Sequence, residues 1–87
     1  MKFAAARPYA DPEAAARKLI EIANSVEAVQ DGRIHIELIN GPMLFDLKAT
    51  PAEYSAGLNL AIERGWLEMH ESGTYVKFTQ AGAELFA

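Results

Sequence analysis

The sequence predicts a small α+β domain, and three observations carry that prediction. Two segments, residues 11–26 and 50–65, repeat apolar residues at helical spacing behind strong capping signals. Shorter segments at 33–36, 66–69 and 74–78 alternate apolar and polar residues, as half-buried strands do. The chain has 87 residues, which fits one domain with a single modest core.

The first helix is predicted to begin at Pro12. Asp11 precedes it as a capping residue, and Glu13 favours the positive end of the helix dipole. The pair Asp31-Gly32 ends this helix or the loop that follows it. The apolar residues that share one face at helical spacing, and so form the predicted buried side, are Ala15, Ala16, Leu19, Ile22, Ala23 and Val26.

The sequence of residues 37–47 is compatible with two structures. Apolar residues in 37–47 follow helical spacing, but Gly41-Pro42 lies among them. Proline removes a backbone donor and disfavours the helical conformation at the residue before it. Either a helix is kinked at this point, or a short turn leads into a helix that starts at Pro42.

A second strong helix start stands at Thr50-Pro51, where Glu53 completes a capping box. Gly65 is predicted to end this helix. Its predicted buried residues are Tyr54, Leu58, Ala61 and Ile62.

The last part of the chain reads as a tight hairpin and a short helix. Gly73 supplies the positive φ that the turn between the two strands needs. Thr79 is positioned to cap a final helix that carries Leu85 and Phe86. The strand residues expected to face the core are Leu67, Met69, Val76 and Phe78.

Two segments resemble the winged helix-turn-helix superfamily. Leu58 and Ala61 stand seven and four residues before Gly65, and two large apolar residues follow it, a spacing similar to the end of the family's recognition helix. Residues 75–82 resemble its third strand and the Thr-x-x-Gly turn after it. The chain is also similar to small uncharacterised bacterial proteins of this superfamily. The resemblance implies a winged-helix-like domain with three main helices, a small antiparallel sheet with a short wing hairpin, and a short C-terminal helix. It implies no activity, because fold and function separate easily.

The charge pattern departs from that of DNA-binding members of the superfamily. The predicted solvent face of residues 51–64 holds two acids and one base, and the net charge of the chain is -4. Such a balance disfavours nucleic acid and membrane surfaces as partners. The residues able to contact DNA are Lys48, Asn59, Arg64, His70 and Lys77.

A protein partner suits the same helix better. Ala52, Ala56 and Leu60 are spaced four apart and form a small apolar stripe where a DNA reader would be polar. Trp66 either extends this surface or caps the core. The partner is another protein or a second copy of the chain.

The sequence contains no catalytic constellation. It has no cysteine and two histidines, without the spacing of a metal site, a triad or a phosphate loop. No catalytic, cofactor-binding or metal-binding residue is therefore predicted, and the chain is not expected to be an enzyme.

The chain is expected to comprise a flexible lead-in, residues 1–10, and one domain, residues 11–87. No stretch reaches the roughly 18 apolar residues that a membrane span needs, and the lack of cysteine fits a reducing cytoplasm. The predicted function is a non-enzymatic, cytoplasmic interaction module. The alternative is a DNA-binding transcriptional regulator that uses a winged helix-turn-helix.

Overall fold

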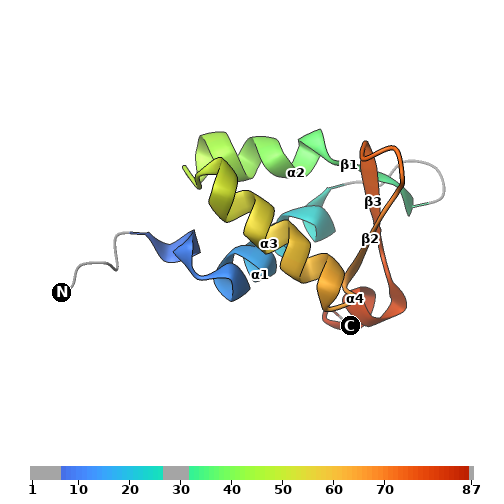
Figure 1. The fold of residues 1–87 in the computed structure, drawn as a ribbon. Helices are drawn as coiled ribbons and strands as arrows, with labels where there is room; N and C mark the ends of the chain where they lie inside the picture. Colours follow the sequence, from blue (N-terminus) through green and yellow to red (C-terminus); the bar gives the residue numbers. More distant parts are fainter. Residues whose placement is uncertain (1–6, 27–31, 87) are drawn as a thin grey trace.

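The computed structural model describes residues 7–26 and 32–86, and within these ranges the chain forms four α-helices and a three-stranded antiparallel sheet. The predicted α+β class is confirmed, and the layout is consistent with a winged helix. Figure 1 shows α1 and α3 packed together in the middle, α2 along one side of them, and the β2–β3 hairpin with α4 at one end. In chain order the elements are the 3₁₀ turn η2 (Pro8–Ala10), α1 (Pro12–Ser25), β1 (Ile34–His35), α2 (Glu37–Gly41), the π-helical turn η4 (Pro42–Asp46), α3 (Pro51–Glu63), β2 (Leu67–Met69), β3 (Tyr75–Phe78) and α4 (Gln80–Glu84).

Side-chain caps fix the starts of the two long helices, as their sequences predict. The Asp11 carboxylate accepts the backbone N–H of Glu13 at 3.1 Å at the start of α1. At the start of α3 the Thr50 hydroxyl accepts the Glu53 N–H at 3.1 Å, and the Glu53 carboxylate accepts the Thr50 N–H at 2.9 Å. This reciprocal pair satisfies two backbone donors that the first helical turn leaves without partners.

The helix continues through Gly41-Pro42. Gly41 is helical at φ -56° and ψ -58°, and Pro42 at φ -57° and ψ -40°. Gly41 tolerates this position because it has no Cβ to meet the proline ring. Pro42 cannot donate a hydrogen bond, and the next turn widens, so that the Leu47 N–H bonds the Pro42 carbonyl at 2.9 Å. The sequence left open a helix through Gly41-Pro42 or a turn before a helix at Pro42. The structure has the continuous helix, which widens into a π-turn at Pro42.

The core lies between α1 and α3, where small residues bring the two backbones close together. A Cβ added to Gly57 would stand 2.7 Å from the Ala15 Cβ. The predicted faces need correction: Ile20 of α1 is buried, whereas Ile22 of α1, Val26 just after it and Ile62 of α3 are half-buried. α1 packs against α3, η2 and α2, so its buried arc is wider than the single stripe that helical spacing predicts. Buried residues of the two helices are Ala15, Ala16, Leu19, Ile20, Ala23, Tyr54, Gly57, Leu58 and Ala61.

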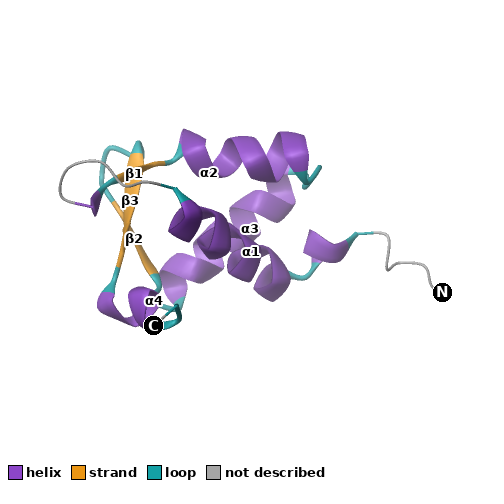
Figure 2. Cartoon of the chain, turned by 180° about the vertical axis from the view of Figure 1, so that it is seen from behind, coloured by secondary structure: helices purple, strands orange, loops and turns teal. Residues whose placement is uncertain are grey.

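The sheet has the strand order β1-β3-β2, so β3 is its central strand (Figure 2). Val76 of β3 lies opposite Ile34 on one side and Met69 on the other. Ile34, Leu67 and Val76 are buried against the helices, whereas Met69 and Phe78 are half-buried. Neighbouring residues of β2 and β3 point to the opposite, solvent side of the sheet.

A tight joint ties α4 to the end of α3. The Thr79 N–H bonds the Trp66 carbonyl at 3.1 Å, and the Thr79 hydroxyl donates to the Gly65 carbonyl. The same hydroxyl accepts the Gly82 N–H at 3.0 Å and so caps α4. A Cβ on Gly82 would fall 2.0 Å from the Trp66 carbonyl oxygen. The Thr-x-x-Gly spacing therefore has a local reason: the threonine bonds both segments and the glycine lets them touch.

Part of the lead-in is docked, and the ends of two predicted helices differ from those expected. Within the lead-in, the described residues 7–10 are docked: Tyr9 packs against the core and Arg7 binds Glu53 at 2.7 Å. α1 ends at Ser25, and of the predicted Asp31-Gly32 end, Asp31 lies outside the described residues. Leu85 and Phe86 follow α4 and remain exposed.

Candidate interaction surfaces

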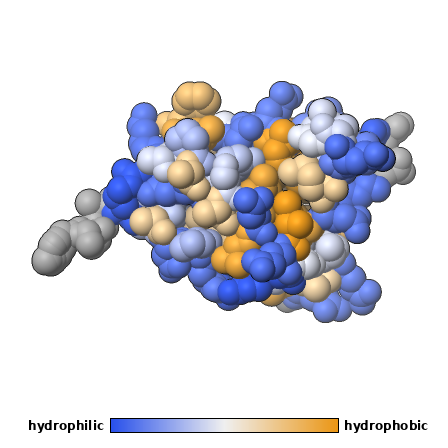
Figure 3. Space-filling view, viewed as in Figure 1, coloured by the Kyte–Doolittle hydropathy of each residue, from blue (hydrophilic) through white to orange (hydrophobic). Residues whose placement is uncertain are grey.

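The solvent side of α3 is largely apolar or acidic. Ala52 and Ala56 are exposed, and Leu60 is half-buried because it packs partly against the core. Asn59 and Glu63 are exposed on the same side. These five residues are called the outer face of α3. Figure 3 views the molecule from the side of α3 and shows hydrophobic side chains gathered between α2 and the second half of α3, bordered by hydrophilic ones.

Arg64, predicted as a DNA contact on α3, forms an ion pair within the protein. The Arg64 guanidinium binds the Glu13 carboxylate at 2.7 Å, and Arg17 binds the same carboxylate at 3.0 Å. Hydrogen bonding to these two guanidiniums lowers the pKa of Glu13, and the bond to Glu13 raises the pKa of Arg64. Both guanidiniums also lie over the Trp66 ring, at 5.6 Å for Arg17 and 5.4 Å for Arg64.

Trp66 is 8% exposed. Of the two roles left open by the sequence, it therefore caps the core, and it offers little area to a partner in this conformation.

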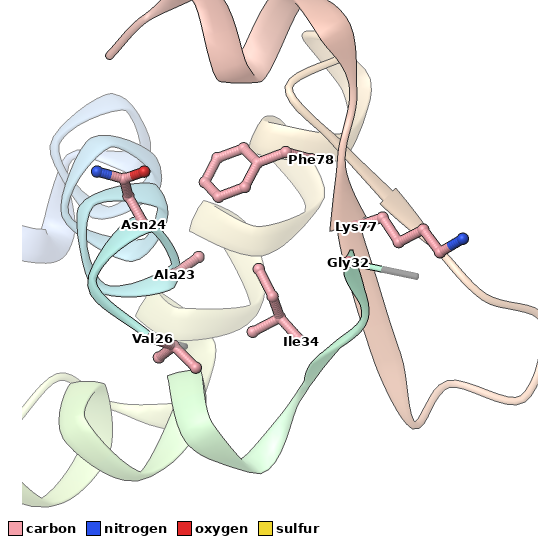
Figure 4. A pocket seen from close by; sticks show the side chains of 7 residues that line it. All are labelled: Ala23, Asn24, Val26, Gly32, Ile34, Lys77 and Phe78. Atoms are coloured by element: carbon pink, nitrogen blue, oxygen red, sulfur yellow. The ribbon is translucent and has the colours of Figure 1, made fainter. Parts of the chain in front are cut away.

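The remaining predicted DNA contacts lie on separate elements. Lys48 is exposed in the loop before α3, with a left-handed φ of 62°. His70 stacks on Tyr75 at 4.5 Å between ring centroids, and its Nδ1 accepts the Ser72 N–H at 3.1 Å. Lys77 extends from β3 away from α1 (Figure 4). The structure brings His70 and Lys77 to the hairpin, where they line a shallow hollow of about 250 Å³, but Lys48 lies on a different element.

Sequence reasoning missed two exposed large apolar side chains in the segment 37–47. Phe45 in η4 is 74% exposed and Leu38 in α2 is 43% exposed. Their neighbours Ile39 and Met43 are fully buried. Helical apolar spacing indicated that this segment packs against the core, but it did not indicate which of its apolar residues would be left outside. The signal was an excess of apolar residues around Gly41-Pro42, more than one helical face holds.

A hollow of about 300 Å³ lies between the end of α1 and the sheet (Figure 4). Ala23, Ile34 and Phe78 give it an apolar lining, and the Lys77 ammonium group points away from it. In residues 7–26 and 32–86 no group of three or more His, Cys, Asp or Glu side chains is placed to hold a metal ion.

Comparison with known proteins adds no relative: no family model, no curated protein and no solved structure matches the chain. Within the described ranges, none of the helices has the length and apolar character needed to cross a membrane.

Proposed function

We propose that this chain is a non-enzymatic protein-interaction module that uses the outer face of α3. The observation that carries the proposal is the chemistry of that face: it presents Ala52, Ala56 and part of Leu60. A helix that binds DNA needs free cations to neutralise phosphates. The arginine on this helix, Arg64, is instead bound to Glu13 of α1. Small exposed residues allow a second backbone to approach closely, and Leu60 adds apolar area.

The partner to test first is a second copy, because a symmetric dimer uses one patch twice and is the commonest soluble assembly. Sedimentation velocity over a range of concentrations is expected to show a dimer at micromolar concentration. Ala56→Lys and Leu60→Lys are expected to give folded monomers. Ala56→Lys is the cleaner variant, since Ala56 is exposed whereas Leu60 also packs against the core.

A control substitution separates a specific contact from a general effect of added charge. Ala83 is exposed on α4 and is not part of the outer face of α3, so Ala83→Lys is expected to leave the dimer intact. A wild-type chain that stays monomeric up to high concentration excludes the second copy and leaves a different protein as the partner.

The second candidate function is DNA binding, which the exposure of Asn59, Lys48 and His70 and the winged-helix-like layout favour. The expected dissociation constant for duplex DNA at physiological salt is no tighter than the ~10⁻⁴–10⁻⁶ M range of non-specific binders. Fluorescence anisotropy with random and genomic duplexes measures it. A nanomolar complex with a steep salt dependence would overturn the proposed function.

A further inference from the structure

Leu38 and Phe45 form an exposed apolar surface that the core does not use. The two residues are seven apart on the helical segment formed by α2 and η4, and both side chains are exposed. They flank buried Ile39 and Met43, which already fill the space against the core. Exposed Phe45 contributes little to folding, and aromatic side chains of this kind commonly anchor protein contacts. Leu38, Phe45 and the flanking acids Glu37 and Asp46 are called the Phe45 corner.

The backbone is unusual at the same corner. Phe45 stands in a π-helical turn, a rare conformation that is frequent at functional sites. Three residues later Lys48 adopts a left-handed φ of 62°. The carbonyl of Lys48 is bound by Arg7 at 3.5 Å, and Arg7 also holds Glu53, so the corner is tied to the start of α3. The Phe45 side chain is thus presented from a helical segment whose C-terminal end is fastened to Arg7 and Glu53.

The acidic residues at the two ends of the Phe45 corner favour a partner with basic residues. Glu37 and Asp46 are exposed at its two ends, no lysine or arginine occurs in residues 34–47, and the exposed Lys48 follows Asp46 by two residues. If two copies met through this helix in antiparallel fashion, Glu37 of each copy would approach Asp46 of the other, and like charges in an interface are repulsive. A segment with an apolar face and basic residues at its ends would bury Phe45 and pair both acids.

We propose that the Phe45 corner binds a basic amphipathic helix of a partner protein. Phe45 and Leu38 enter its apolar face, and Glu37 and Asp46 pair with its lysine or arginine side chains. This surface is separate from the outer face of α3. Ala56→Lys is therefore expected to leave it intact, and Phe45→Ala is expected to leave assembly through α3 intact.

The test uses the full chain and two labelled synthetic peptides of about 14 residues, roughly four helical turns. Both carry the same leucine face, one with lysine and one with glutamate at the polar positions. In fluorescence anisotropy the lysine peptide is expected to bind and the glutamate peptide is not. Phe45→Ala is expected to weaken binding roughly tenfold or more, as loss of an interface anchor does. Leu85→Ala removes a different exposed apolar side chain and is expected to change nothing.

A charge-matched pair of variants tests the acids. Glu37→Lys with Asp46→Lys is expected to abolish most of the binding and its salt dependence. Glu68→Lys with Glu71→Lys changes the net charge by the same amount at the exposed hairpin and is expected to retain binding. The proposal is overturned if the lysine peptide fails to bind wild type, or binds Phe45→Ala equally well. It is also overturned if sedimentation shows a wild-type dimer that Phe45→Ala dissociates, because the occupant is then a second copy.

Discussion

The α1–α3 contact and the Phe45 corner are both helical, yet they use apolar residues in opposite ways. In the first, Ala15 and Ala16 are fully buried and Gly57 lets the helix backbones approach closely. In the second, the helix widens into a π-turn and leaves Phe45 74% exposed. Apolar residues therefore hold the fold together at one place and remain available to a partner at the other. Substitutions that remove apolar side chains from each region distinguish the two roles.

The largest effect is expected from Leu58→Ala. Leu58 is 9% exposed in the α1–α3 core, and truncating such a side chain typically costs ~2–5 kcal/mol of unfolding free energy. Phe45→Ala removes a larger side chain but is expected to change the unfolding free energy by less than ~0.5 kcal/mol, as is Glu63→Ala on the outer face of α3. Urea denaturation measures all three. Similar losses for Leu58→Ala and Phe45→Ala would contradict the assignment of Phe45 to the surface.

A smaller loss is expected from Gly57→Ala. The added Cβ would lie 2.7 Å from the Ala15 Cβ and 3.0 Å from the Ala15 backbone carbon, so the two helices must move apart. Overpacking of this kind costs ~1–3 kcal/mol, although alanine is the better helix former. Asn59→Ala, on the exposed side of the same helix, is the control and is expected to stay within ~0.5 kcal/mol of wild type. A Gly57→Ala chain that is more stable than wild type would show that the packing between α1 and α3 accommodates the added methyl group.

The parts of the fold that could be predicted from the sequence are those that depend on nearby residues. Asp11, Thr50 and Thr79 cap the helices they were expected to cap, because a cap is a bond between residues two or three apart. Gly65 and Gly73 have the positive φ that ends a helix and turns a hairpin. The π-turn was not predictable in this way, because the rule for Pro42 opposes the helix and tertiary packing decides the outcome.

The candidate surfaces depend on long-range contacts, which sequence spacing does not reveal. Whether Arg64 is free to contact DNA depends on its ion pair with Glu13, which is 51 residues away in the sequence. Trp66 had two expected roles, and its burial beneath Arg17 and Arg64 decides between them. The stripe of Ala52, Ala56 and Leu60 was predicted on the solvent side, and there only Leu60 is partly covered. Which apolar residue of the segment 37–47 stays exposed, Phe45 among them, depends on how that segment packs against the core.

The smallest expected effect concerns the place where the two regions meet. Arg7 bonds Glu53 at the start of α3 and the Lys48 carbonyl at the end of the Phe45 corner. The hydrogen bond from Arg7, with that from the Thr50 backbone, lowers the pKa of Glu53 from its ordinary 4.5 to about 2. Because the folded state binds this proton less readily than the unfolded state, the ionised carboxylate stabilises the fold above pH 4.5. That contribution is lost as the pH falls from 4.5 through about 2.

Replacing Arg7 isolates this contribution, because it leaves the capping bonds between Thr50 and Glu53 in place. Urea denaturation of wild type and Arg7→Gln at neutral pH and at several acidic pH values is expected to show a gap that is constant above pH 4.5 and closes toward pH 2. The gap closes because protonated Glu53 no longer attracts Arg7, so that the two chains become equivalent at this site. Glu13 has its own lowered pKa and adds the same trend to both chains, so it cancels in the difference. A gap that persists unchanged at pH 2 would mean that Arg7 acts through the Lys48 carbonyl instead, and that η2 is fastened to the Phe45 corner more than to α3.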